Sequence, residues 1–256
     1  MNAKTISLLI FLAAYLLFIF LPRKRTHTAV LAALALILTG ALSFKEAFFS
    51  VNWNVMGIFV GTLVIADIFM ESRVPAYIAE VIVSKAKNTA WSILLICLLT
   101  GFISAFVENV ATVLIVAPIA LSLARKLKIN PMQMMIAIAV SSNLQGTATL
   151  IGDPPSMLLG GFAKMNFSDF FFYKGRMGIF FAVELGALAS FVVLYLIFRN
   201  HKEKVGFVQI EKIKSWVPTI ILVSLIVLLA LSSFFDTGFS YAAGVICMAS
   251  AIIAAL

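Results

Sequence analysis

The chain has 256 residues, of which 62% are apolar and only 12% are charged, and its mean hydropathy is +1.10. No soluble domain can bury that much hydrocarbon, so the composition excludes a soluble globular protein and indicates one that lies in a bilayer. The net charge of +8 does not indicate a nucleic-acid partner, because the basic residues lie in short segments between apolar runs, where they set membrane topology.

A helix needs about 20 apolar residues to cross a bilayer, with roughly 17 as the lower limit. Runs of this kind are 4–21, 28–44, 53–70, 176–198, 215–235 and 240–256. No small-x-small cleavage site separates the first run from Arg23-Lys24-Arg25, so we interpret it as a retained span rather than a signal peptide. The shorter, mixed run 75–88 is expected to be an interfacial helix.

Basic residues concentrate in four of the segments between these runs, namely 23–27, 71–90, 125–131 and 199–214. These segments hold 14 of the 19 Lys and Arg residues. Cytoplasmic loops carry an excess of such residues, so we expect all four segments on the cytoplasmic side of a multi-pass protein in the cell inner (plasma) membrane.

The run 91–124 has a basic segment on either side, so it must leave one side and return to it. Two thin spans or one re-entrant hairpin would both do this. Each arm has about 16 residues, which is short for a span. The centre, Phe106-Val107-Glu108-Asn109-Val110, contains neither Gly nor Pro and is less polar than an external loop. We therefore expect a re-entrant hairpin whose tip stops inside the membrane.

The hairpin tip carries candidate ligands. Asn109 and Thr112 are three residues apart, so they share one face of a helix. If the second arm begins at Asn109, its N–H groups and positive dipole end point at the tip. Neutral ligands suit a solute that must also leave; the alternative is an outer polar turn with Asn109 as helix cap. Glu108 is a candidate proton or cation site, unless it reaches the interface or pairs with a base such as Arg73.

The run 132–164 is long enough to cross the membrane, but small, polar and helix-breaking residues interrupt it. The side chains and bare backbone that the break offers come from Ser142, Asn143, Gly146, Thr147 and Thr149. Irregular backbone at membrane depth survives only where protein covers it or where it lines a watery cavity, so the break predicts a solute site. Gly146 permits a positive φ and a close approach by the solute.

The sequence Gly152-Asp153-Pro154-Pro155 is expected to end the first half of this broken helix. Asp153 is well placed to cap the second half, with the two prolines in its first turn. A proton or cation role is the alternative for Asp153. An external loop between two short helices fails on length, since 132–143 alone is too short to cross.

Five crossings precede the basic segment 199–214. Because five is odd, a second copy of the unit that starts near residue 215 would be inverted, as in many secondary transporters. We therefore expect a first repeat over 1–214 and the start of a second, incomplete repeat over 215–256. Glu184, inside the apolar run 176–198, is expected to face the bundle as a structural partner or a proton site.

Two stretches carry a resemblance to a known family. They are Glu108-Asn109-Val110-Ala111-Thr112-Val113-Leu114 with Ala117-Pro118, and Ser142-Asn143-Leu144-Gln145-Gly146-Thr147-Ala148-Thr149-Leu150-Ile151-Gly152-Asp153-Pro154-Pro155. The chain resembles the ArsB/NhaD permeases of the ion-transporter superfamily, especially the arsenite permease and P-protein branch with its citrate-transporter-like domain.

The resemblance implies a two-repeat permease that moves its site past a scaffold, often as a homodimer. It implies an inorganic ion or small anion as solute, such as arsenite, with proton or sodium coupling and no other cofactor or metal. Asn109 and Thr112 would then be ligands at the hairpin tip, and Asn143, Gly146 and Thr147 would line the unwound site. The sequence departs from the family pattern at Gln145 and Ser156, where Gly and Asn are usual.

We interpret the chain as an all-α polytopic secondary transporter and not as an enzyme. One alternative is a truncated, non-transporting remnant, or a half-transporter subunit that needs a complementary second half. An intramembrane enzyme with Asp67 and Asp153 as an aspartyl pair is disfavoured. The two residues lie near opposite faces in the predicted topology, and no metal-ligand pattern such as H-E-x-x-H is present.

Overall fold

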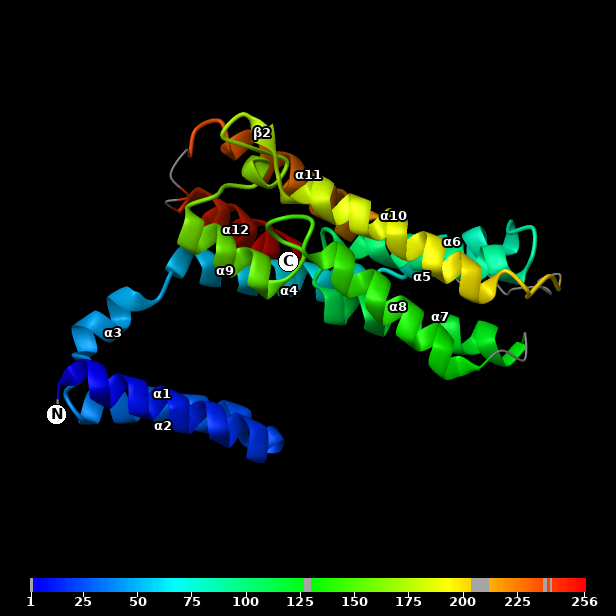
Figure 1. Cartoon of the computed structure of the whole chain (residues 1–256). Coiled ribbons are helices and arrows are strands. Elements are labelled where there is room, and N and C mark those ends of the chain that lie inside the picture. The colour runs from blue at the N-terminus through cyan, green and yellow to red at the C-terminus, as the bar shows by residue number, and fades with distance from the viewer. Residues whose placement is uncertain (1, 127–129, 204–211, 237–238, 240) are drawn as a thin grey trace. The chain divides into compact units, whose positions relative to one another are not determined.

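The computed structural model describes residues 2–126, 130–203, 212–236, 239 and 241–256. Over these residues the chain forms twelve α-helices and one short antiparallel ribbon (Figure 1). This confirms the predicted all-α class at the level of secondary structure. Lys128 and Lys204, which belong to the predicted cytoplasmic segments, lie outside the described residues. The chain divides into two compact units, one up to Asn52 and one from Trp53 onward.

The first unit is a pair of antiparallel helices followed by a short third helix. It contains α1 (Ala3–Phe20), the 3-10 turn η1 (Pro22–Lys24), α2 (Arg25–Leu38) and α3 (Phe44–Ser50). The predicted span 28–44 is wrong at its C-terminal end, because α2 ends at Leu38. Gly40 follows with a φ of 68°, and its N–H donates to the carbonyl of Ile37 at 3.0 Å. A glycine in this left-handed conformation terminates the helix.

The second unit holds the remaining elements. They are α4 (Trp53–Glu71), α5 (Val74–Ser84), α6 (Thr89–Ser104), α7 (Asn109–Lys126), α8 (Pro131–Gly146), α9 (Pro154–Ala163), η2 (Ser168–Phe170), β1 (Phe172–Tyr173), β2 (Arg176–Met177), α10 (Ile179–Phe198), α11 (Val217–Ser232) and α12 (Ala242–Ala255). The two hairpin arms and the interruption after α8 lie where the sequence predicts helices and a break. The β1–β2 ribbon was not expected; Lys174 and Gly175 at its turn both have a positive φ, which suits a tight hairpin turn.

Three of the described helices, α1, α4 and α10, are long and apolar enough to cross a membrane. The other strongly apolar stretches found among the described helices have 10 to 17 residues; they include the hairpin arms, Thr89–Ser104 and Asn109–Arg125, and the C-terminal pair α11 and α12. The spans predicted at 215–235 and 240–256 are therefore shorter as helices than as apolar runs.

The connecting segments of the second unit gather at two ends. The N–H of Lys214 donates to the carbonyl of Ser72, and the N–H of Thr89 donates to that of Glu203, each at 3.0 Å. The described ends of the basic segment 199–214, at Glu203 and at Lys214, therefore each contact the basic segment 71–90. At the other end, the side-chain amide of Asn166 donates to the carbonyl of Ser233 at 3.3 Å.

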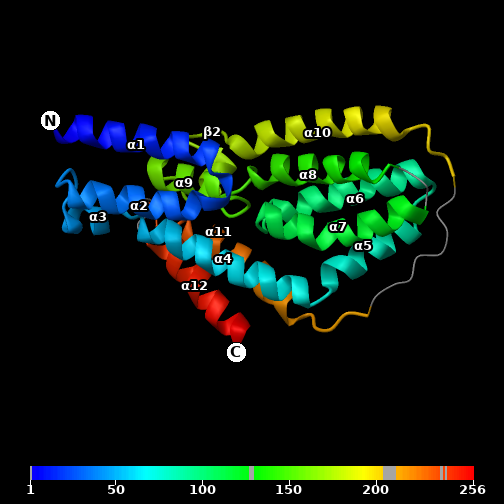
Figure 2. The ribbon, with the colours of Figure 1, turned by 90° about the horizontal axis from the view of Figure 1, so that it is seen from below.

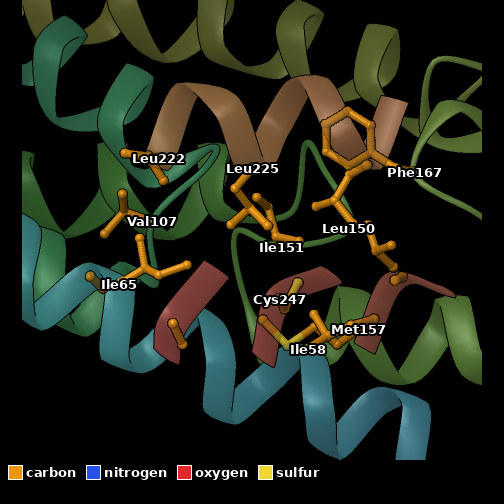
Figure 3. Packing of buried hydrophobic residues seen from close by; sticks show 14 of the residues in the cluster. Ile58, Ile65, Val107, Leu150, Ile151, Met157, Phe167, Leu222, Leu225 and Cys247 are labelled. Atoms are coloured by element: carbon orange, nitrogen blue, oxygen red, sulfur yellow. The ribbon is translucent and has the colours of Figure 1, made fainter. Parts of the chain in front are cut away.

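The core of the second unit includes irregular main chain as well as helices. Figure 3 shows Ile58 of α4 beside Cys247 of α12, and Leu225 of α11 beside Ile151, all 0% exposed. The cluster also includes residues from the turn between α6 and α7 and from the linker between α8 and α9. These are Val107, Leu150 and Ile151, which are 2%, 0% and 0% exposed. Both irregular segments are therefore covered by packed protein, as unwound backbone in an apolar environment requires.

Helix α12 packs on α4 through glycines. A Cβ atom added at Gly61 would lie 2.5 Å from the carbonyl carbon of Cys247, and one at Gly57 would lie 3.0 Å from the Cα of Gly244. Asn54 closes the contact, since its side-chain oxygen accepts from the N–H of Gly244 at 2.6 Å. This Gly-x-x-x-Gly arrangement lets the two backbones approach closely, and it fixes α12 to the first part of the unit.

Candidate functional site

The hairpin of α6 and α7 turns sharply without glycine or proline. Helix α6 starts at an Asn88 cap, whose side-chain oxygen accepts from the N–H of Trp91 at 3.0 Å. Helix α7 starts at Asn109, as the sequence predicts. Immediately before it, the Glu108 carboxylate accepts from the N–H of Ala111 at 3.0 Å and is 8% exposed. Glu108 is therefore a buried cap of α7.

The broken helix stops earlier than expected. Helix α8 ends at Gly146 and α9 begins at Pro154, so the irregular segment runs over 147–153 (Figure 2). The prediction that the first half-helix ends at Gly152 is wrong. The N–H of Ala148 donates to the carbonyl of Gln145 at 3.0 Å, which forms a turn in place of the next α-helical hydrogen bond. Asp153 caps α9 as predicted, accepting from the N–H of Ser156 at 2.9 Å.

The hairpin tip and the broken helix meet. The side-chain amide of Asn109 donates to the side-chain oxygen of Asn143 at 2.8 Å, and the hydroxyl of Ser142 donates to the carbonyl of Asn109 at 3.0 Å. Residues 34 positions apart in the chain thus form one polar contact, and the Asn109–Asn143 bond is its exposed part. The two interruptions are therefore in contact; that this contact lies inside the membrane at the tip of a re-entrant hairpin stays a prediction.

Buried hydroxyls extend this contact behind the asparagine pair. The Ser104 hydroxyl donates to the carbonyl of Ser142 at 2.9 Å, and the two serine hydroxyls lie 3.0 Å apart. The Thr149 hydroxyl donates to the carbonyl of Ala105. The Thr149 bond satisfies the carbonyl at the C-cap of α6, which the end of that helix leaves without a helical partner. Sequence reasoning missed Ser104; its signal was the Thr100–Ser104 spacing of four, which puts two hydroxyls on one face of an apolar arm.

Glycine at position 152 is what allows the segments to approach. A Cβ there would lie 2.3 Å from the carbonyl oxygen of Gly146 and 2.8 Å from that of Ser104. At Gly146 itself, a Cβ would find only ordinary contacts of 3.4 Å or more, and Gly146 is not among the described glycines with a positive φ. The expectation that Gly146 supplies the special conformation is wrong, because Gly152 is the glycine that backbone surrounds.

The other predicted site residues have structural partners. The Thr112 hydroxyl is fully buried and donates to the carbonyl of Glu108 at 3.1 Å, so it faces its own helix start. The Thr147 hydroxyl donates to the carbonyl of Leu144 at 2.8 Å. Asn109 and Asn143 are the predicted ligands whose polar groups meet at an exposed position.

The N-termini of α7 and α9 both start beside this contact, but they differ in the donors they offer. In α9, Pro154 and Pro155 have no N–H, the N–H of Ser156 is capped by Asp153, and that of Met157 donates to the Asp153 carbonyl at 3.2 Å. In α7, Glu108 takes the N–H groups of residues 111 and 112. The first two N–H groups of α7 are not used by Glu108, so α7 is the helix start that can donate to a solute.

Comparison with known proteins agrees with this architecture. The sequence profile of the family described as "Citrate transporter" matches residues 15–256. The chain belongs to the citrate transporter family. It is therefore a multi-pass membrane protein of a transporter family, which confirms the predicted membrane location and the predicted relationship to the ion-transporter superfamily.

The chain is also similar to individual membrane proteins that are much longer than itself. An uncharacterized transporter of Mycobacterium tuberculosis is 29% identical over 190 residues, which cover 72% of this chain and 44% of that protein. The human P protein is 28% identical over 204 residues, covering 77% of this chain and 24% of that protein. A 46 kDa membrane protein of Mycobacterium leprae is 28% identical and is covered to 44%. The chain thus spans less than half the length of the curated relatives it matches.

Proposed function

We propose that the chain forms part of a secondary transporter that carries an inorganic ion or small anion, bound between the hairpin tip and the broken helix. The observation that supports this most directly is the Asn109–Asn143 hydrogen bond of 2.8 Å, which joins the two irregular segments at an exposed position. A solute that competes for these amides would bind where the hairpin meets α8.

The ligands that we propose are neutral. The amides of Asn109 and Asn143 supply donors and acceptors, and the start of α7 adds backbone N–H groups and a positive dipole end. The Gly146 backbone and the Thr147 hydroxyl complete the lining, with Thr112 as a buried support. Neutral donors suit an anion that must bind weakly enough to be released. Arsenite and a small carboxylate are the solutes to test first.

Glu108 and Asp153 are proposed to act first as helix caps. Each accepts an N–H bond from the helix that it precedes, at 3.0 and 2.9 Å. A carboxylate at a helix N-terminus also offsets the positive dipole end. Proton or sodium coupling would therefore require one of these caps to release its N–H partner when it binds the coupling ion.

Transport itself is proposed to proceed by alternating access. The hairpin and α8 are joined at the tip mainly through side-chain hydroxyls and amides, which can exchange partners with a solute or water. Residues 53–256 form one compact unit, and the matched relatives are more than twice as long as the aligned region. We therefore propose a complementary second half, in the same protein or another subunit, as the partner that completes the transporter.

The test replaces Asn109 by alanine in the complete transporter and measures uptake of labelled citrate and arsenite into proteoliposomes. We expect at least a tenfold loss of flux for the solute that is carried, with unchanged membrane insertion. Asn88→Ala is the matched control, since Asn88 caps the other arm of the same hairpin. Normal flux in Asn109→Ala would overturn the proposed site, and equal loss in Asn88→Ala would show a general folding effect.

A further inference from the structure

A cavity lies between α6, α8 and α10, on a different side of α8 from the contact with the hairpin tip. Its volume is about 250 Å³. Its lining is mostly apolar, with Leu98, Leu144, Leu188, Phe191 and Leu194 among its walls. This cavity differs from the proposed solute site, because α8 turns Ser142 toward the hairpin and Gln145 toward α10.

One end of this cavity carries a carboxylate. Glu184 of α10 lines it, and its Oε2 accepts from the side-chain amide of Gln145 at 3.3 Å. Gly101 of α6 makes room for this amide, since a Cβ there would lie 2.9 Å from the Cγ of Gln145. Among the described residues that line the cavity there is no Lys, Arg or His. Within the described lining, the Glu184 carboxyl group is therefore contacted by the Gln145 amide and by no basic side chain.

An acidic side chain in an apolar segment of a membrane protein is costly unless it is paired. A cation in the cavity would supply the missing charge. Calcium and magnesium ions take about six or more oxygen ligands, whereas the polar side chains among the described lining residues are Ser141, Gln145, Glu184 and Ser190, with the thiol of Cys97. The cavity is also several times larger than one water, which takes about 30 Å³. Both observations favour a cation that brings its own hydrocarbon.

We propose that this cavity binds a small aliphatic ammonium ion. The Glu184 carboxylate pairs with the ammonium group, Gln145 holds that carboxylate in place, and the leucines with Phe191 cover the hydrocarbon part. Such division into an apolar body and one orienting charge is typical of small-molecule sites. Because Gln145 lies in the last turn of α8, an occupied cavity would hold α10 against the broken helix. The proposal concerns binding alone and does not depend on the solute that is transported.

The test measures saturable binding of n-butylammonium to the detergent-purified full chain by calorimetry. Butan-1-ol and butyrate serve as probes of the same length with no charge and with negative charge. We expect saturable binding of n-butylammonium only, and at least a tenfold weaker affinity in Glu184→Gln, which keeps the shape and the hydrogen bond to Gln145. Ala187→Phe, which fills the cavity from α10, should abolish binding while Glu184 remains.

Several results would overturn the proposal. Equal binding of butan-1-ol would show that the charge plays no part. Unchanged affinity in Glu184→Gln would exclude this carboxylate, and saturable binding of sodium in place of n-butylammonium would assign the cavity to an inorganic ion. Both variants must melt within a few degrees of the parent protein. Asp67→Asn, on α4, removes one carboxylate elsewhere and should bind n-butylammonium normally.

Discussion

Two close contacts between helical segments of the second unit are built differently. The hairpin tip meets the broken helix through amides and hydroxyls, such as the pair Asn109 and Asn143. Helix α12 meets α4 through bare backbone at Gly61 and Gly244. Hydrogen bonds from side chains can be exchanged for bonds to water or solute, whereas close glycine contacts are lost outright when the helices separate. The comparison suggests one contact that is suited to rearrange and one that fixes the framework.

The largest expected effect comes from the glycine inside the polar contact. In Gly152→Ala, the new Cβ would lie 2.3 Å from one backbone oxygen and 2.8 Å from another, so the linker must shift away from the hairpin. We expect a loss of about 3 kcal/mol in the free energy of unfolding in mixed micelles. Gly146→Ala, at the last residue of α8, is the control, because its added Cβ would make only ordinary contacts; it should change the free energy of unfolding by about 0.5 kcal/mol at most. Equal losses would refute the assignment of Gly152.

The second largest effect on stability is expected at the glycine contact between α4 and α12. In Gly61→Ala, the Cβ would lie 2.5 Å from the carbonyl carbon of Cys247, and we expect a loss of about 2 kcal/mol, because α12 can tilt to relieve it. The same unfolding titration measures this. Gly186→Ala, whose Cβ would meet only a Leu144 methyl at 3.5 Å, should be nearly silent. A silent Gly61→Ala would mean that α4 and α12 are less closely packed.

A smaller loss of stability is expected at the start of α9, where two substitutions of Asp153 distinguish its capping role from a role of its charge. Asp153→Ala removes the acceptor for the Ser156 N–H and should cost about 1 kcal/mol. Asp153→Asn keeps an acceptor and should cost only a few tenths of that. Transport by the complete protein is measured alongside, and loss of flux in Asp153→Asn with normal stability would assign a proton or cation role to this carboxyl instead.

The smallest expected effect is a pH dependence of helix capping in α3, which lies outside both contacts. Glu46 forms a capping box with Ser43 at the start of α3, and hydrogen bonds from the Ser43 hydroxyl and N–H lower the pKa of Glu46. Since its folded pKa is lowered, the capping contribution is complete above the ordinary Glu value of about 4.3 and is lost as pH falls through the lowered value.

Amide hydrogen exchange in α3 should therefore become faster on acidification below that range. Glu46→Gln, which removes the titrating group but keeps the capping geometry, should make the exchange rate insensitive to pH after correction for intrinsic exchange. Acceleration of the same size in Glu46→Gln would show that another group is responsible.

Much of the architecture followed from the order of residues. Basic segments predicted that certain loops share an end, and two of these segments are in contact, since the Lys214 N–H donates to the Ser72 carbonyl and the Thr89 N–H to that of Glu203. The polar interruptions predicted the start of α7 at Asn109 and the Asp153 cap, because capping preferences are local. Thr112 illustrates the limit: spacing put it on the Asn109 face, but its hydroxyl bonds to the backbone of its own helix start.

Close contacts between backbone segments could not be predicted from the sequence. Nothing in a single sequence says which of Gly146 and Gly152 is surrounded by backbone, since that depends on where Ser104 and Ala105 lie. The crossing at Gly57 and Gly61 was likewise missed, although the spacing of four was visible. Its partner, Gly244, is far away in the chain, and only tertiary packing selects it.

The sequence by itself determined a helical membrane protein with two interruptions and their caps, because hydropathy, loop charge and capping act over a few neighbouring residues. Tertiary structure alone decided that the interruptions share one polar contact, that backbone surrounds Gly152 more closely than Gly146, and that Gln145 donates to Glu184. The physical reason is that steric and hydrogen-bond complementarity act over a few ångströms between segments that the chain separates by tens of residues.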